Sequence, residues 1–210
     1  MAPRYKLTYF DYRSKAEVIR LLFVAGGVEF EDVRIPLEDW AQIKPSTPFG
    51  RLPILEFDGI TLPESRAIAN YVARETGLYG KSNLQQAQID VVMAIIQDLH
   101  LAFSVAYEQK DEKTKEELIK HFFEQDCFKF FNWLEELLVK NNGGDGFFVG
   151  ESLTIADLDF YAAHELVLQR NPTALQTLPK LEALVSRVEN IPKIKAWLPN
   201  RPVKAFYRLP

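Results

Sequence analysis

The pattern of apolar and polar positions divides the chain into two parts with different predicted elements. In the first part, alternation from Tyr5 to Tyr9 is typical of a strand. From Ser14 the apolar positions follow one helical face, and Gly26 and Gly27 predict the end of that helix. The chain therefore begins with a strand followed by a helix.

The rest of this first part predicts three more strands and a second helix. Phe30 to Ile35 alternates again and predicts a second strand. Asp58-Gly59 lies between two apolar runs and is a strong hairpin signal, so we expect paired strands over residues 53–57 and 60–62. Ser65 predicts the N-cap of a helix that runs to about residue 76. This order indicates a small α/β sandwich.

Beyond Gly80 the apolar spacing is helical throughout. It predicts helices over residues 84–108, 113–140, 155–170, 180–190 and 192–198. Thr154 and Asp157 have the spacing of a capping box, with Asp157 in place of the more common Glu. We therefore expect an α/β domain over residues 1–80 and an all-helical domain over residues 84–210.

Composition and charge narrow the class of protein. Of the 210 residues, 47% are hydrophobic and 26% are charged, which is typical of a globular protein. The net charge of −4, without a basic stripe, argues against nucleic acid and anionic membranes as partners. Cys127 is the only cysteine, which fits a reducing compartment. Since we find neither a signal-like N-terminus nor an apolar run of about 20 residues, the length that a membrane span needs, we expect a cytoplasmic protein.

Common catalytic motifs are missing from the sequence. The three histidines, His100, His121 and His164, do not show metal-ligand spacing, so we expect no metal site. The chain also lacks the glycine-rich motifs of nucleotide binding and the G-x-S-x-G motif of serine hydrolases. We therefore expect neither nucleotide-dependent chemistry nor serine hydrolase activity.

Two short stretches on either side of the predicted hairpin could form one binding site. Phe49 to Pro53 places a proline after a glycine-containing turn, which marks a sheet edge, a turn or a cis bond. Glu64-Ser65 begins a helix, where free backbone N–H groups and the positive end of the helix dipole favour a carboxylate. A plain helix cap is the alternative interpretation of this second stretch.

These stretches belong to a set of motifs that resembles the cytosolic glutathione transferases, most closely the sigma class that includes haematopoietic prostaglandin D synthases. The matching segments lie in order along essentially the whole chain and include residues 5–10, 18–20, 30–34, 40–45, 48–53, 64–71 and 150–157. The resemblance implies a thioredoxin-like N-terminal domain followed by an all-α C-terminal domain. It also implies glutathione as co-substrate, with no other cofactor, and a homodimer.

The resemblance further implies a role in glutathione binding for ten residues. Tyr9 would hydrogen-bond the glutathione sulfur and favour its thiolate, which is the nucleophile. The glycyl end would contact Trp40 and Lys44, and Ser65 and Glu64 would take the γ-glutamyl carboxylate and ammonium. The remaining positions are Leu52 with a cis Pro53 at the cysteinyl backbone, the basic residues Lys15 and Arg51, and Asp98, which would reach glutathione across a dimer interface.

The acceptor substrate is less defined than glutathione. Candidate residues of a second-substrate pocket are Phe10, Tyr12, Arg13, Phe103, Val105, Phe160 and Phe206, which could equally be core aromatics. Val105 and Asp159 stand where the prostaglandin D synthases have tryptophan and tyrosine, and Ala94 and Gln97 replace two of their metal-binding carboxylates. The expected reaction is therefore conjugation of glutathione to apolar electrophiles in detoxification, with hydroperoxide reduction as a further activity.

Two alternatives remain open at this point. One is glutathione-dependent synthesis of prostaglandin D2. The other is a non-catalytic carrier of haem or lipid, or a lens-crystallin relative. The family's crystallins carry a long insertion between the first two helices of the second domain, whereas the connection over residues 110–114 is short here. That difference argues against a purely structural role.

Overall fold

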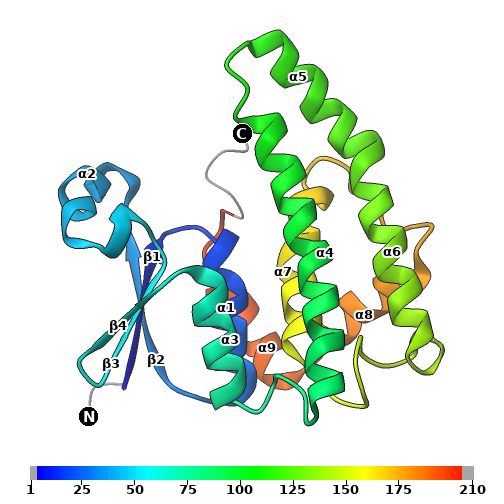
Figure 1. Cartoon of the computed structure of the whole chain (residues 1–210), viewed down its shortest axis with the longest axis horizontal. Coiled ribbons are helices and arrows are strands. Elements are labelled where there is room, and N and C mark those ends of the chain that lie inside the picture. Colours follow the sequence, from blue (N-terminus) through cyan, green and yellow to red (C-terminus); the bar gives the residue numbers. More distant parts are fainter. Residues whose placement is uncertain (1–3, 205–210) are drawn as a thin grey trace. The chain divides into compact units, whose positions relative to one another are not determined.

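The computed structural model describes residues 4–204, which form two compact units. Among the described residues, the first unit combines residues 4–79 with residues 189–204, and the second unit spans residues 80–188 (Figure 1). The sequence led us to expect the first domain to end at residue 80, and the N-terminal part of the first unit ends at residue 79. The segment from residue 189 packs with the first unit, whereas the sequence led us to expect it in an all-helical domain over 84–210.

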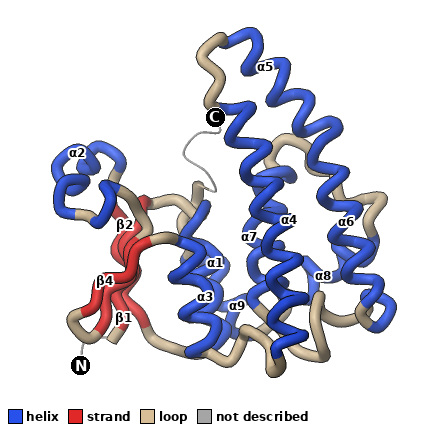
Figure 2. Tube along the Cα trace, in the orientation of Figure 1, coloured by secondary structure: helices blue, strands red, loops and turns tan. Residues whose placement is uncertain are grey.

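The first unit is built on a four-stranded mixed sheet, as the α/β prediction requires. The strand order is β2-β1-β3-β4, and the strands are β1 (Tyr5–Phe10), β2 (Phe30–Ile35), β3 (Ile54–Phe57) and β4 (Ile60–Pro63). β1 pairs with β2 in parallel through the crossover helix α1 (Ser14–Gly26), and the other two pairings are antiparallel. Helices α1 and α3 (Ser65–Glu75) lie together on one face of this sheet (Figure 2). The thioredoxin-like prediction is confirmed.

A buried charge network ties the late segment to this unit. Arg20 on α1 is fully buried, and its Nε donates to Asp32 Oδ1 on β2 at 2.8 Å. Its Nη1 donates to the Tyr12 carbonyl at 2.8 Å and lies 3.3 Å from Glu17 Oε2. Glu17 in turn accepts from Trp197 Nε1 at the end of α9 (Pro192–Trp197) at 3.3 Å. The network explains why α9 packs on α1.

The second unit is helical, as predicted, with one interruption. Its helices are α4 (Asn83–Tyr107), α5 (Glu112–His121), α6 (Cys127–Lys140), α7 (Ile155–Leu168) and α8 (Pro179–Glu189). The single helix expected over residues 113–140 is instead divided by a π-helical segment, Phe122–Asp126. The apolar pattern runs through this segment without a break, so periodicity alone does not reveal it.

Helix α4 also corrects the expectation that the chain has no long apolar run. Among the described residues it is the one helix that is long and apolar enough to cross a membrane, and 39% of its apolar window is buried inside the structure. Its buried side chains include Ile89, Ile96 and Leu99. Because one face of α4 forms part of the core, its composition is that of a central helix in a bundle.

The predicted capping box at the start of α7 is confirmed. Asp157 is fully buried, and its Oδ2 accepts from Thr154 N and Thr154 Oγ1 at 2.7 and 2.9 Å. Its Oδ1 accepts from Phe148 N at 2.7 Å, which ties the preceding loop to the helix. Burial nevertheless raises the pKa of this carboxyl to about 6, although the three hydrogen bonds oppose the shift.

We expect this raised pKa to give a pH-dependent contribution to stability. A group whose pKa is higher in the folded state stabilises most below its unfolded value near 3.8, and the contribution is lost as the pH rises through about 6. Asp157→Asn cannot titrate, so the stability difference between wild type and this variant should narrow by about 2 kcal/mol from pH 4 to pH 7. Urea unfolding of both proteins at each pH measures it. A difference that widens would show that the folded state favours the carboxylate.

Candidate active site

Strand register brings three of the predicted binding segments to one end of the sheet. Thr8 on β1 pairs with Ile54 on β3, so Tyr9 lies beside Pro53. Ile54 also pairs with Pro63 on β4, so Pro53 lies beside Glu64. All of these residues belong to the first unit. The two stretches that the sequence placed on either side of a hairpin therefore meet at a common edge.

Tyr9 lies at this edge, at one end of a short row of aromatic rings. Only 5% of Tyr9 is exposed, and its ring centroid is 5.4 Å from that of Phe10. Phe10 meets Trp40 edge to face at 5.2 Å. These contacts connect the end of β1 to the helical turns that follow β2.

Those turns carry Trp40 and Lys44 one helical turn apart. Trp40 begins the short helix α2 (Trp40–Ile43), and Lys44 begins the 3-10 turn after it. Thr47 Oγ1 donates to the Lys44 carbonyl at 2.9 Å and holds this turn in place. Gly50 has a left-handed φ of 60°, and a Cβ there would lie 3.2 Å from Lys44 Cε. Thr47 and Gly50 thus support Lys44. The sequence indicated a turn at Gly50 but gave no sign of the role of Thr47.

The start of α3 differs in one respect from the prediction. Glu64, not Ser65, is the N-cap residue, and Ser65 is the first residue of the helix. Glu64 has φ 71° and ψ 112°, a conformation that non-glycine residues rarely adopt and that is common at functional sites. No side chain caps this helix, so its first backbone N–H groups remain available to an anion. The sequence could not reveal a positive φ at a glutamate.

Charged groups flank the same edge. The Leu52–Pro53 bond is cis, as the resemblance implied. Next to it, Arg51 Nη1 lies 3.8 Å from Glu64 Oε1, and both side chains are exposed. Lys15 is exposed on the first turn of α1, directly after β1. The edge therefore combines a buried tyrosine, an open helix N-terminus and exposed basic side chains.

The predicted second-substrate residues are divided between the two units. Phe10, Tyr12 and Arg13 belong to the first unit, and Phe103, Val105 and Phe160 belong to the second. Phe160 is 1% exposed and packs against Phe131 and Phe148, so it serves the core of its unit and the structure does not support a pocket role for it. Phe103 is 8% exposed, Val105 is 55% exposed, and Phe206 lies outside the described residues.

Two further predicted features concern the acidic residues. Asp98 is exposed on α4, in the second unit. Within residues 4–204, three or more His, Cys, Asp or Glu side chains do not come together in an arrangement that could hold a metal ion.

Cys127 is buried, and burial raises the pKa of its thiol to about 11, which makes it a poor nucleophile at neutral pH.

Comparison with known proteins assigns the family. Residues 5–74 match the model of the glutathione S-transferase N-terminal domain, and residues 97–201 match that of the C-terminal domain. Glutathione S-transferase 1 of Ascaris suum is 39% identical over 209 residues, which cover 95% of this chain and 98% of that protein. The solved structure of rat hPGDS complexed with a quinoline has a TM-score of 0.88 at 34% identity, and the match covers 97% of this chain and 100% of that one.

A crystallin is equally similar. S-crystallin SL11 of Nototodarus sloanii is 39% identical over 205 residues, which cover 97% of this chain and 100% of the crystallin. Because the match takes in that whole protein, the short connection over residues 110–114 does not separate this chain from crystallins, contrary to our expectation. The family models and the relatives nevertheless agree on one assignment. This chain belongs to the glutathione S-transferase family and is a transferase that uses glutathione.

Proposed function

We propose that Tyr9 activates the glutathione thiol at the end of the sheet and that the thiolate is then conjugated to an apolar electrophile. The observation that carries this proposal is the strand register, which places Tyr9, Pro53 and Glu64 side by side. A free thiol has a pKa of about 8.5, so little of it is thiolate at neutral pH. A hydroxyl that donates a hydrogen bond to the sulfur favours the thiolate and lowers that pKa.

The remaining groups at the edge suit the other parts of glutathione. The open N-terminus of α3 and the Ser65 hydroxyl would bind the γ-glutamyl carboxylate, and Glu64 would take its ammonium group. The backbone of Leu52 would pair with the cysteinyl moiety. Lys44 would pair with the glycyl carboxylate beside Trp40, while Lys15 and Arg51 would add positive potential around the tripeptide, which carries net negative charge.

The chemical step follows from this arrangement. The thiol proton leaves to solvent as glutathione binds, and Tyr9 keeps its own proton as the hydrogen-bond donor. The thiolate sulfur then forms a bond to the electrophilic carbon, and the leaving group departs with the electron pair of its bond. Holding both reactants in one site supplies the proximity that accelerates a bimolecular reaction. Conjugation of a chloronitroarene, followed by absorbance, tests for this activity.

We expect Lys44→Gln to weaken glutathione binding more than it slows the chemical step. The lysine would contact only the glycyl carboxylate, far from the sulfur, so its loss should raise KM for glutathione about tenfold, as expected for one charge-assisted contact. Steady-state kinetics with glutathione varied would measure both constants. Lys81→Gln removes an exposed lysine of the second unit and should change neither. If kcat falls while KM is unchanged, Lys44 does not hold glutathione in its ground state.

A homodimer in the cytoplasm is the assembly and location we propose. Leu84, Val91, Leu101 and Val105 are exposed at helical spacing along α4. Asp98 lies on the same stripe, which would allow it to reach the glutathione of a second subunit. An apolar stripe of this kind on a helix is typical of an association surface. Sedimentation equilibrium gives the mass in solution.

Prostaglandin D2 synthesis is the second candidate function. Its support is the similarity to the structure of rat hPGDS over almost the whole of both chains. Val105 and Asp159 count against it, since the family resemblance implies bulkier aromatic residues at those two positions in the synthases. Incubation with prostaglandin H2 and glutathione tests whether the protein has this synthase activity. Prostaglandin D2 above the background without enzyme would support the synthase, and only background product would exclude it.

A further inference from the structure

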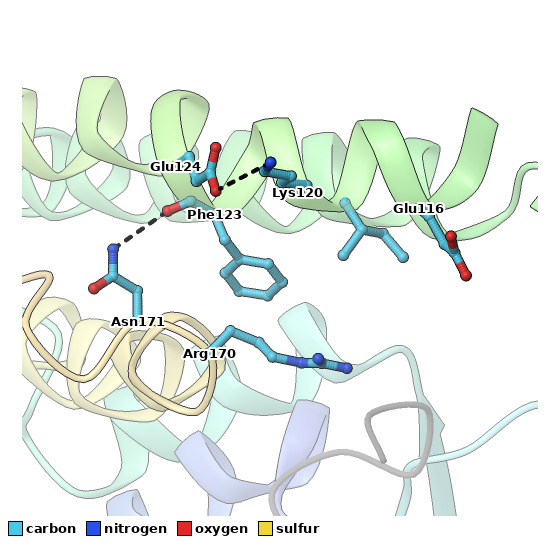
Figure 3. A pocket seen from close by; sticks show the side chains of 7 residues that line it. Glu116, Lys120, Phe123, Glu124, Arg170 and Asn171 are labelled. Atoms are coloured by element: carbon cyan, nitrogen blue, oxygen red, sulfur yellow. Dashed lines mark hydrogen bonds and ion pairs between the residues drawn. The ribbon is translucent and has the colours of Figure 1, made fainter. Parts of the chain in front are cut away.

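The second unit contains a cavity of about 660 Å³ that the proposed glutathione site does not use (Figure 3). One wall is formed by α5 and the π-helical segment after it, and the other by the chain that follows α7. The lining residues are Glu116, Ile119, Lys120, Phe123, Glu124, Arg170 and Asn171. All seven lie within residues 80–188, so the cavity is a feature of this unit alone.

The π-helical segment and Asn171 hold the two walls together. Within Phe122–Asp126 the regular α-helical ladder is interrupted, and the Phe123 carbonyl accepts from Cys127 Sγ at 3.3 Å. The same carbonyl accepts from Asn171 Nδ2 at 3.5 Å across the cavity, and Asn171 Oδ1 accepts from Thr173 Oγ1 at 3.0 Å. Such π-helical segments are frequent at functional sites.

The middle of the cavity is apolar. Figure 3 shows the Phe123 ring pointing from its helix into the space between the walls. The rings of Phe103 and Phe122 pack against the Phe123 ring, and their centroids lie 5.8 and 5.1 Å from its centroid. Ile119 adds a half-buried aliphatic side chain one turn earlier on α5. An apolar group between the walls would therefore leave water and contact carbon on both residues.

The charged groups of the lining divide into a pair and two unpaired residues. Lys120 Nζ lies 3.9 Å from Glu124 Oε1 on the same wall, so these two neutralise each other. Glu116 and Arg170 take part in no side-chain hydrogen bond or ion pair with other residues in the range 4–204. They project from opposite walls, Glu116 from α5 and Arg170 from the turn that follows α7 (Figure 3).

We propose that this cavity binds a small zwitterion with an apolar tail, such as an α-amino acid with a long aliphatic side chain. The carboxylate would pair with Arg170, the ammonium group with Glu116, and the tail would lie on Phe123 and Ile119. A simple anion would pair with Arg170 but would be repelled by the unpaired Glu116. A simple cation would pair with Glu116 but would be repelled by Arg170. The zwitterion satisfies both charges. This site lies beyond the proposed transferase function and does not depend on it.

Three probes with the same tail and different headgroups test the proposal on the full chain. They are 2-aminodecanoate, decanoate and decylamine, each titrated by calorimetry and by amide NMR below its micelle-forming concentration. We expect the zwitterion to bind about tenfold more tightly than either of the others, as one additional charge-assisted contact would give. Its largest NMR shifts should fall on residues 116–124 and 169–171. Equal affinity of the three probes, or shifts centred elsewhere, would overturn the proposal.

Matched variants separate the headgroup contacts from general charge effects. Glu116→Gln and Arg170→Gln should each weaken the binding of 2-aminodecanoate about tenfold. Glu116→Gln should not weaken the binding of decanoate, and Arg170→Gln should not weaken the binding of decylamine. Glu117→Gln and Lys110→Gln change the same charges at exposed positions outside the cavity and should leave the affinity unchanged. If Glu116 and Arg170 instead pair only with each other, both glutamine variants will lose stability without any change in probe binding, and the site is refuted.

Discussion

Tyr9→Phe should lower the kcat of glutathione conjugation about 100-fold, the loss typical when one hydrogen-bond donor to a developing or stored anion is removed. The variant loses a single oxygen, and the aromatic contact with Phe10 remains. Glutathione itself should bind almost as tightly as before, because its carboxylates and ammonium group would contact other residues. Initial rates at saturating glutathione, together with calorimetric titration of glutathione, measure the two effects.

Tyr5→Phe is the matched control for this experiment. Tyr5 lies on the same strand, and its hydroxyl donates to Glu75 Oε2 at 3.2 Å, away from the candidate site. Removing it should cost at most about 1 kcal/mol of stability and leave kcat unchanged. If Tyr5→Phe and Tyr9→Phe reduce kcat equally, the effect belongs to the strand as a whole and the assigned role of Tyr9 is wrong.

Arg20→Met should lower the free energy of unfolding by about 3–5 kcal/mol, because it leaves carboxylates without the cation that they face. Glu17 is 1% exposed, and Asp32 would retain Arg34 Nε, at 2.7 Å, as its remaining cationic partner within residues 4–204. The change also removes the donor that holds the Tyr12 carbonyl in the turn after β1. Urea unfolding followed by circular dichroism measures the loss.

Two further variants show whether burial causes this effect. Arg4→Met breaks the exposed pair between Arg4 and Asp58 and should leave the free energy of unfolding almost unchanged, because surface ion pairs contribute little to stability. Adding Glu17→Gln to Arg20→Met should restore part of the lost stability, since one stranded buried charge is then removed. A loss after Arg20→Met as small as that of Arg4→Met would contradict the structural importance of the network.

Local signals account for most of the fold that the sequence predicted. Strand alternation, the Asp58-Gly59 turn and the glycine at the end of α1 are all set by neighbouring residues, and each was found at or within a few residues of its expected place. The family resemblance then indicated which of these elements carry glutathione contacts. The strand register then brings the candidate residues together, because Ile54 pairs with both Thr8 and Pro63.

The features that the sequence did not predict depend on distant contacts or on backbone geometry. The Trp197 to Glu17 hydrogen bond joins residues 180 positions apart, and local periodicity says nothing about such a contact. The π-helical segment keeps the apolar spacing of the helices around it. Phe160 was expected in the second-substrate pocket but is buried in the core. An aromatic side chain in a helix has the same sequence signature whether it faces a core or a ligand.

Activation of the glutathione thiol by Tyr9 is the central claim, and ultraviolet difference absorbance of bound glutathione against pH tests it most directly. The thiolate absorbs where the thiol does not, so the titration reports the pKa of the bound sulfur. We expect thiolate at neutral pH in the wild-type protein and a protonated thiol in Tyr9→Phe. If glutathione binds to both proteins but stays protonated in both, Tyr9 does not activate it, and the chain is better explained as a ligand carrier with a transferase fold.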